Sequence, residues 1–200
     1  MAAVTDLLFS LDARIVLWLN QAVGIFGPLD AAMYVLGSDY FVPVSQALGL
    51  LGLWFSGETQ RHREHRQRAV LRAALSLGFA ALVIVICNHF WFRERPFAHL
   101  EVANLLYEPT DSSFPANPAA ISFAIASGAF TGNRKAGLAM FLLAALWVLA
   151  RVANGVYYPS DVLAGAAIGM AVGPAARLVL RLMEPAPTWL IQGFRFFHLA

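Results

Sequence analysis

Five apolar runs separated by short polar stretches constrain the fold of this chain more than any other feature. They cover residues 41–55, 69–91, 118–130, 136–150 and 162–179. A helix needs about 20 apolar residues to cross a bilayer, a length that the longer runs reach and the shorter ones approach. Only helices and closed barrels cross lipid, and these runs lack the alternation of barrel strands. The pattern therefore predicts an all-α, polytopic membrane helix bundle with five to six transmembrane helices.

The composition agrees with an integral membrane protein of one domain. Of the 200 residues, 59% are hydrophobic and 13% are charged, and the mean hydropathy is +0.63. A soluble domain is nearer half apolar and a quarter charged, so a soluble globular protein is excluded. The single cysteine, Cys87, cannot form an intrachain disulfide.

The segment before the apolar runs, residues 1–38, carries several polar and charged side chains. Gly27-Pro28 divides it, and Asp12 and Asp30 make a full crossing unfavourable. We expect two short interfacial or re-entrant helices here, and a sixth span is the alternative.

The rest of the chain divides into a helical core, residues 39–182, and a C-terminal tail, residues 183–200. Pro185 and Pro187 are expected to stop a helix. The aromatic side chains of the tail suit the membrane surface or contact with a membrane protein partner.

Basic residues predict the orientation of the chain. They gather between the first two runs (residues 61–72), between the third and fourth (134–135) and after the fifth (177–181). The positive-inside rule puts these groups in the cytoplasm, and we expect a bacterial inner membrane. Residues 92–117 and 156–160 then share the opposite face. The charge run at 61–68 is interpreted as a topology signal and not as a nucleic-acid site.

Three polar blocks lie at or beside that opposite face, in residues 88–97, 111–126 and 150–161. They read NHFWFRERPF, DSSFPANPAAISFAIA and ARVANGVYYPSD. In order and spacing they resemble the type 2 phosphatidic acid phosphatase family, whose pattern is Lys-x6-Arg-Pro, Pro-Ser-Gly-His and Ser-Arg-x3-Gly-x-His-x3-Asp. The phrases RERPF, EPTDSSFP and GVYYPSDVLAG are most similar to its bacterial undecaprenyl-diphosphate phosphatase branch.

The resemblance implies a role for each place in the pattern. The third-block histidine would attack phosphorus, and the aspartate four residues later would orient its imidazole. The second-block histidine would protonate the departing oxygen. The lysine and two arginines would neutralise the phosphoryl oxygens.

This sequence keeps some of these groups and departs at others. It keeps the phosphate-binding Arg95 and Arg151, with Gly155 and Asp161 in support. The five replaced places, in the order lysine, serine, acid histidine, serine and nucleophilic histidine, are Asn88, Ala116, Pro118, Ala150 and Tyr157.

The departures predict a catalytically silent protein that keeps a partial lipid-phosphate pocket. Proline cannot donate a proton, and a free tyrosine has a pKa of about 10. Losing part of a nucleophile–base unit costs on the order of 10⁴ in rate. The expected ligand is a polyprenyl or glycerolipid phosphate, without cofactor or metal. Two alternatives are a structural subunit of a larger membrane complex and an active phosphatase that uses unusual groups such as Tyr157 or His99.

Several local alternatives remain open at this point. Asn117 is expected to cap the third run, with Pro118 in its first turn. The carboxylate of Asp161 has three possible roles: bonding Tyr157, pairing with Arg151 or capping its own helix.

The acidic loop before the second block offers further alternatives. Glu94 is expected to pair with a neighbouring arginine. Glu108 or Asp111 is a candidate to close over the arginines and fill the pocket with a salt bridge, which would abolish ligand binding as well as catalysis. His89 and His99 are interpreted as interfacial or loop residues, and with Glu101 and Glu108 they lack a metal-ligand spacing.

Overall fold

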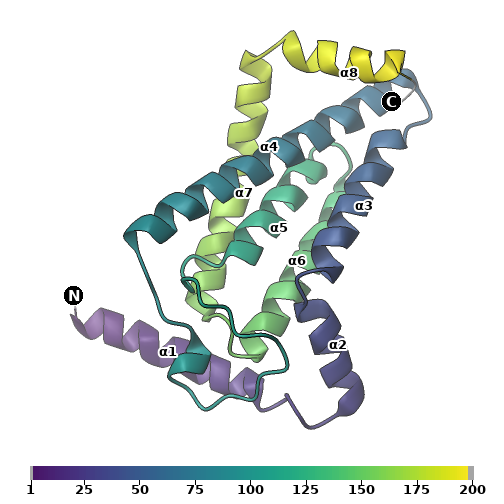
Figure 1. The fold of residues 1–200 in the computed structure, drawn as a ribbon. Coiled ribbons are helices and arrows are strands. Elements are labelled where there is room, and N and C mark those ends of the chain that lie inside the picture. The colour runs from purple at the N-terminus through teal and green to yellow at the C-terminus, as the bar shows by residue number, and fades with distance from the viewer. Residues whose placement is uncertain (1, 198–200) are drawn as a thin grey trace.

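The computed structural model describes residues 2–197, which fold into α-helices and one 3₁₀ turn (Figure 1). No strand occurs in this range, so the predicted all-α class is confirmed. The elements are α1 (Ala2–Asn20), α2 (Gly27–Gly37), α3 (Phe41–Phe55), α4 (Gln60–Phe90), η1 (Pro96–Ala98), α5 (Asn117–Phe130), α6 (Arg134–Ala153), α7 (Pro159–Leu182) and α8 (Ala186–Phe196).

Each of the five apolar runs forms one helix, from α3 to α7. By length and composition, α4, α6 and α7 are able to cross a membrane. α3 has 15 residues and α5 has 14, fewer than the roughly 20 needed for an independent crossing. α5 lies inside the bundle, where its neighbours compensate for its length, because it packs against α4, α6 and α7.

Small residues let α7 approach α5 very closely. A Cβ atom added at Gly165 would lie 2.4 Å from the carbonyl oxygen of Ala116, and one at Gly169 would lie 2.5 Å from that of Ala120. Such contacts between backbones are typical of helix packing in membranes. The hydrophobic effect does not drive helices together in lipid, and small side chains let the backbones approach closely enough for van der Waals packing. The packing of α5 on α7 brings the second block beside the third.

The N-terminal segment forms two helices, as its charges predict, but the break comes earlier than expected. α1 ends at Asn20, and Pro28 lies in the first turn of α2, a position that proline tolerates. α1 lies across one end of the bundle, together with the loop that precedes α5 (Figure 1). We call this end, which carries the three blocks, the motif end.

The C-terminal tail is mostly helical. α7 ends at Leu182, before Pro185, but Pro187 lies in the first turn of α8 and does not stop a helix. α8 packs against α4 and lies across the end of the bundle opposite the motif end (Figure 1). Its Phe194 makes an edge contact with Trp54 of α3. The last residues of the predicted tail, 198–200, lie outside the described range.

Candidate functional site

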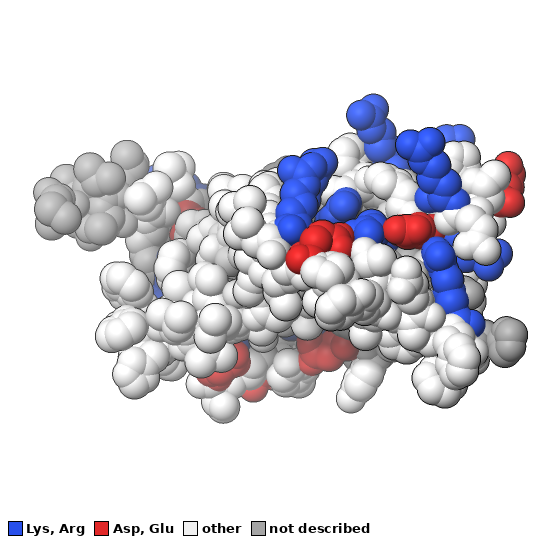
Figure 2. All heavy atoms as spheres, turned by 90° about the horizontal axis from the view of Figure 1, so that it is seen from above, with Lys and Arg blue, Asp and Glu red and all other residues white. Residues whose placement is uncertain are grey.

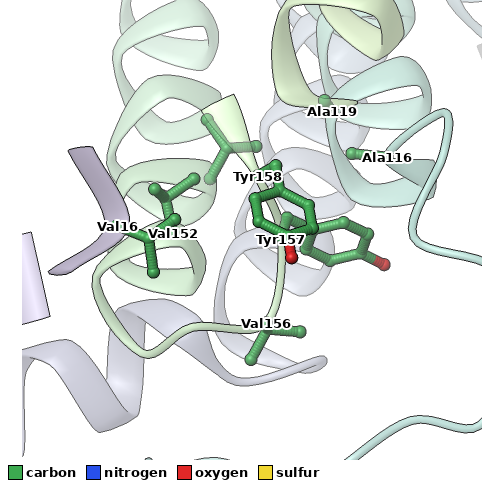
Figure 3. Packing of buried hydrophobic residues seen from close by; sticks show 8 residues of the cluster. Val16, Ala116, Ala119, Val152, Val156, Tyr157 and Tyr158 are labelled. Carbon is green, nitrogen blue, oxygen red and sulfur yellow. The ribbon is translucent and has the colours of Figure 1, made fainter. Parts of the chain in front are cut away.

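The three blocks come together at the motif end through backbone hydrogen bonds. The Phe97 amide donates to the Gly155 carbonyl (3.1 Å) and ties the first block to the third. The Ala116 amide donates to the Asp161 carbonyl (3.0 Å) and ties the second to the third. Figure 3 shows Tyr157 and Tyr158, from the turn between α6 and α7, close to Ala116 at the start of α5.

Gly155 has a conformational reason to be glycine. Its φ is +68°, in the left-handed region that other residues rarely adopt. A Cβ atom there would also lie 2.6 Å from a methyl group of Val102. The residue therefore shapes the turn that presents Tyr157, which agrees with the supporting role expected for it.

Arg95 is almost completely buried, with 3% of its surface exposed, and it holds Tyr157. Its Nη2 donates to the Tyr157 hydroxyl (3.2 Å) and to the Asp111 carboxylate (2.8 Å). Its Nη1 donates to the Val156 carbonyl (3.0 Å), and its guanidinium lies 4.3 Å from the centre of the Tyr157 ring. The carboxylate that closes over this arginine is thus Asp111, one of the two candidates, and not Glu108.

Arg151 is equally buried, at 2% exposed, but its carboxylate comes from another element. Its Nη2 pairs with Asp39, in the turn between α2 and α3, and its Nε donates to the Gly37 carbonyl (3.0 Å). The guanidinium also lies over Trp147, 5.2 Å from the ring centre. The two arginines expected to share one phosphate therefore hold different carboxylates.

The hydroxyl of Tyr157 lies where the resemblance requires an attacking imidazole. Burial raises the pKa of Tyr157, although the nearby Arg95 and Arg151 act in the opposite direction. The phenol is therefore neutral at physiological pH, and a neutral phenol is a weaker nucleophile than an imidazole.

Asp161 is fully buried and has two roles, one of them expected. Its carboxylate accepts the Tyr158 amide (3.1 Å) and so caps α7, as one alternative predicted. Its ion pair, however, is with Arg93, and its other partner is the Ser113 hydroxyl. The expected bond to Tyr157 or pair with Arg151 was wrong, because Arg151 points to the α2–α3 turn.

Arg93 links α1 to the third block. Its Nη2 donates to the Asp12 carboxylate (2.9 Å) and its Nη1 donates to the Ser160 hydroxyl (2.8 Å) and to Asp161. Asp12 in turn accepts the Ser160 amide (3.1 Å). The Arg93 guanidinium lies 4.2 Å from the ring centre of Tyr158. The cation is thus enclosed by two carboxylates and an aromatic face.

The five replaced places lie in the three blocks that meet at the motif end. Pro118 is buried in the first turn of α5, as expected, while Asn117 is the first helical residue and Ala116 takes the capping position. Ala150 is buried in α6. Asn88 lies in the last turn of α4, and its Oδ1 is buried with no hydrogen-bond partner in the described part of the chain.

His89 and His99, the two histidines considered as replacements, each have a contact of their own. His99 pairs with Glu94, so the expected pairing of Glu94 with an arginine was wrong. His89 makes an edge contact with the neighbouring Phe90 ring. Within residues 2–197, no three His, Cys, Asp or Glu side chains gather as a metal site requires.

A cavity of about 510 Å³ opens beside the ion pair of Arg151. Asp39 and Tyr107 form part of its wall, with Tyr34 and Tyr40. Tyr107 is within hydrogen-bonding reach of both Asp39 and Arg151, and burial, followed by Asp39, raises its pKa. The cavity wall thus combines one carboxylate with three aromatic rings, and Arg151 lies behind that carboxylate.

Sequence reasoning missed four side chains that build most of this site: Asp12, Asp39, Arg93 and Ser113. Asp12 and Arg93 carried a usable signal. An ionisable residue among apolar ones is costly unless paired, so each of them implied an unidentified partner. Asp39 and Ser113 had no such signal, because both lie in polar stretches.

Comparison with known proteins identifies a family and several relatives of this chain. The PAP2 superfamily model matches residues 69–183. Undecaprenyl-diphosphatase BcrC of Bacillus subtilis (strain 168) is 32% identical over 168 residues, covering 78% of this chain and 83% of that protein. The bacitracin transport permease protein BcrC of Bacillus licheniformis is 31% identical over 156 residues, covering 76% and 72% respectively.

Two solved structures have the same fold. LpxE of Aquifex aeolicus superposes with a TM-score of 0.61 at 25% identity, covering 82% of this chain and 92% of that one. The PAP2-type phosphatidylglycerolphosphate phosphatase of Bacillus subtilis superposes at 0.58 and 20% identity, covering 92% and 90%, and shows the fold alone. From the family match and the degree of identity, this chain belongs to the PAP2 superfamily of membrane lipid phosphatases.

Proposed function

We propose that this protein is a catalytically silent PAP2 member that binds a lipid phosphate, of polyprenyl or glycerolipid type, without hydrolysing it. The observation that carries the proposal is the pairing of Tyr157 with Arg95 at the place where the family has its nucleophile. A neutral, buried phenol held by a cation replaces the imidazole, and Pro118 replaces the acid. The attacking imidazole and the proton donor to the departing oxygen are therefore both replaced.

Binding is favoured because the carboxylates on the two phosphate-binding arginines are exposed. The side chains of Asp111 and Asp39 are 59% and 42% exposed, whereas those of Arg95 and Arg151 are buried. An exposed carboxylate that a ligand displaces is solvated again by water, so the exchange costs less than breaking a fully buried pair. A phosphate group that bonds both guanidiniums bidentately would displace these carboxylates.

The cavity beside Asp39 supports the proposal, because displacing the Asp39 carboxylate would let a phosphate in this cavity approach Arg151. Its aromatic walls, Tyr34, Tyr40 and Tyr107, lie at the edge of the bundle where the membrane interface would be. In the proposed orientation the protein is in a bacterial inner membrane with this end away from the cytoplasm. The ligand would then be a lipid of the outer leaflet.

Hydrolysis and binding are tested separately on the purified full-length protein. Phosphate release from undecaprenyl diphosphate and from phosphatidic acid is expected to stay at the level of the detergent blank. Undecaprenyl phosphate is expected to be retained in native mass spectra of the wild-type protein. The double variant Arg95→Ala/Arg151→Ala should lose it, and Arg14→Ala, which removes an exposed arginine of α1, should not.

Two results would overturn the proposal. Phosphate release that disappears in Tyr157→Phe would show an active enzyme with an unusual nucleophile. Equal lipid retention in the double variant and the control would show that no phosphate pocket survives around the two arginines.

A further inference from the structure

At the end of the bundle opposite the motif end, arginines from different helices gather around shared cavities. Arg72 of α4, Arg134 of α6 and Arg177 of α7 line one cavity of about 450 Å³. A second, of about 260 Å³, lies beside it and is lined by Arg177 and Arg181. Figure 2, which views the molecule from this end, shows Lys and Arg side chains gathered there. We call Arg72, Arg134, Arg177 and Arg181 the distal arginines.

The distal arginines have no carboxylate partner within residues 2–197. Glu184 lines a further cavity together with Arg72, Arg177 and Arg181, but its carboxylate pairs with Arg68, as does that of Glu64. Arg72 lies within electrostatic reach of Arg68, Arg177 and Arg181. Like charges held close together repel one another, so an anion placed between them is strongly favoured.

One member of the cluster is held in place by the fold. The Arg72 Nη1 donates to the Thr131 hydroxyl (2.8 Å), which donates to the Gly128 carbonyl (2.7 Å). His65 bonds the Thr131 carbonyl from the other side (3.0 Å). These contacts fix the side chain of Arg72 at the cavity wall, so the cavity has a positioned cation before any ligand binds.

An arginine cluster at this end also fits a simple topology signal, which needs only charge near the membrane surface. It does not require cations from three helices to line common cavities, nor a hydroxyl that orients one of them. Both features are expected of a binding pocket. We propose that the distal arginines form a second anion site that takes a phosphate group, and that an anionic phospholipid supplies it.

The shape of the adjoining cavity favours a lipid over a free ion. Beyond Arg177 the 260 Å³ cavity is lined by Phe130, Pro174 and Leu178, on α5 and α7. Leu178 is 58% exposed, so this wall opens toward the outside of the bundle. A phosphate at the arginines would leave the acyl chains beside these apolar side chains. Basic pockets between transmembrane helices bind lipid head groups in this way.

The test uses the full-length protein in nanodiscs or mild detergent, with phosphatidylglycerol as the probe. Titration with phosphatidylglycerol, followed by native mass spectrometry, is expected to show one saturable lipid. In Arg177→Gln/Arg181→Gln the apparent affinity should fall at least tenfold. The control Arg61→Gln/Lys135→Gln removes the same charge from exposed residues of the same end and should change it less than twofold.

A second variant tests the geometry and guards against misfolding. Arg177→Lys/Arg181→Lys keeps both charges but loses the bidentate fork, and we expect about a fivefold loss of affinity. Thermal unfolding of all three variants should match the wild type, because the replaced side chains have no carboxylate partner within the described residues.

Three outcomes would contradict the inference. Equal losses in the control and in the arginine variant would show general surface attraction instead of a pocket. Saturable, arginine-dependent binding of inorganic phosphate without any of phosphatidylglycerol would assign the site to a free ion. Phosphatidylcholine bound as tightly as phosphatidylglycerol would show that charge does not select the ligand.

Discussion

The two ends of this bundle are both rich in arginine, but they differ in which of their arginines contact a carboxylate. At the motif end, Arg93, Arg95 and Arg151 each contact at least one carboxylate. At the opposite end, Arg177 and Arg181 contact none within residues 2–197 and are exposed to the surroundings.

The difference follows from burial. A buried cation must be paired, because its desolvation costs several kcal/mol, whereas an exposed one is solvated by water and counter-ions. The largely buried arginines of the motif end therefore each hold a carboxylate, whereas the exposed Arg177 and Arg181 do not. Whether an arginine is free to bind an anion thus depends less on its position in the sequence than on whether an acidic side chain contacts it in the fold.

The largest effect is expected at the buried pair of the motif end. Asp161→Asn leaves Arg93 with Asp12 alone and removes a charged partner from Ser113 and the cap of α7. We expect the free energy of unfolding to fall by about 3 kcal/mol, the cost of breaking a buried ion pair. Reversible denaturation in mixed micelles measures it.

Arg177→Gln is the matched comparison at the opposite end. It removes one exposed, unpaired charge, and we expect a change within about 0.5 kcal/mol. A similar loss of stability in both variants would mean that the two ends do not differ in the way described.

A smaller effect is expected when one exposed acid is removed from the motif end. Asp111→Asn removes the carboxylate that competes with a ligand for Arg95. We expect undecaprenyl phosphate to bind about fivefold tighter, which corresponds to about 1 kcal/mol. Titration by native mass spectrometry measures the change, and the exposed Glu108→Gln in the same loop is the control. An unchanged or weaker affinity in Asp111→Asn would show that this acid does not mask the arginine.

The smallest effect is a shift in the ionisation of one tyrosine. Because burial raises the pKa of Tyr157, its neutral form stabilises the fold below about pH 10, and this contribution is lost as the pH rises through the folded-state pKa. The difference in absorbance at about 295 nm between the wild type and Tyr157→Phe should appear above pH 10. In the denatured proteins the same absorbance difference is expected at about pH 10, which serves as the reference. An absorbance difference that appears below pH 9 in the folded proteins would contradict the prediction.

Much of the fold could be predicted from the sequence because its signals are local. An apolar run fixes the existence of a helix, and α3 begins and ends at the residues of the predicted run. The meeting of the three blocks was also predictable, since their order and spacing imply one arrangement. The helical character of the tail was not, because Pro187 is compatible with either the end or the start of a helix.

The pairing of charges at the motif end could not be predicted in the same way. Arg93 and Arg95 differ by two positions and have the same chemistry, so no local pattern tells which one reaches Asp161. That choice depends on Asp12, 81 residues earlier, which α1 places against the third block. Long-range packing thus determines which carboxylate each arginine contacts, and the family pattern includes only Arg95 of these two arginines.

Gly165 and Gly169 have a consequence that reaches beyond helix packing. Both follow the third block, Gly165 as the last residue of the phrase GVYYPSDVLAG, and the contact of α7 with α5 at these glycines sets how far the second block stands from the third. A side chain as small as a methyl group at either position would separate the two helices and lengthen the bond between the Ala116 amide and the Asp161 carbonyl. The distance between two of the blocks at the motif end thus depends on two positions where the side chain is a single hydrogen atom.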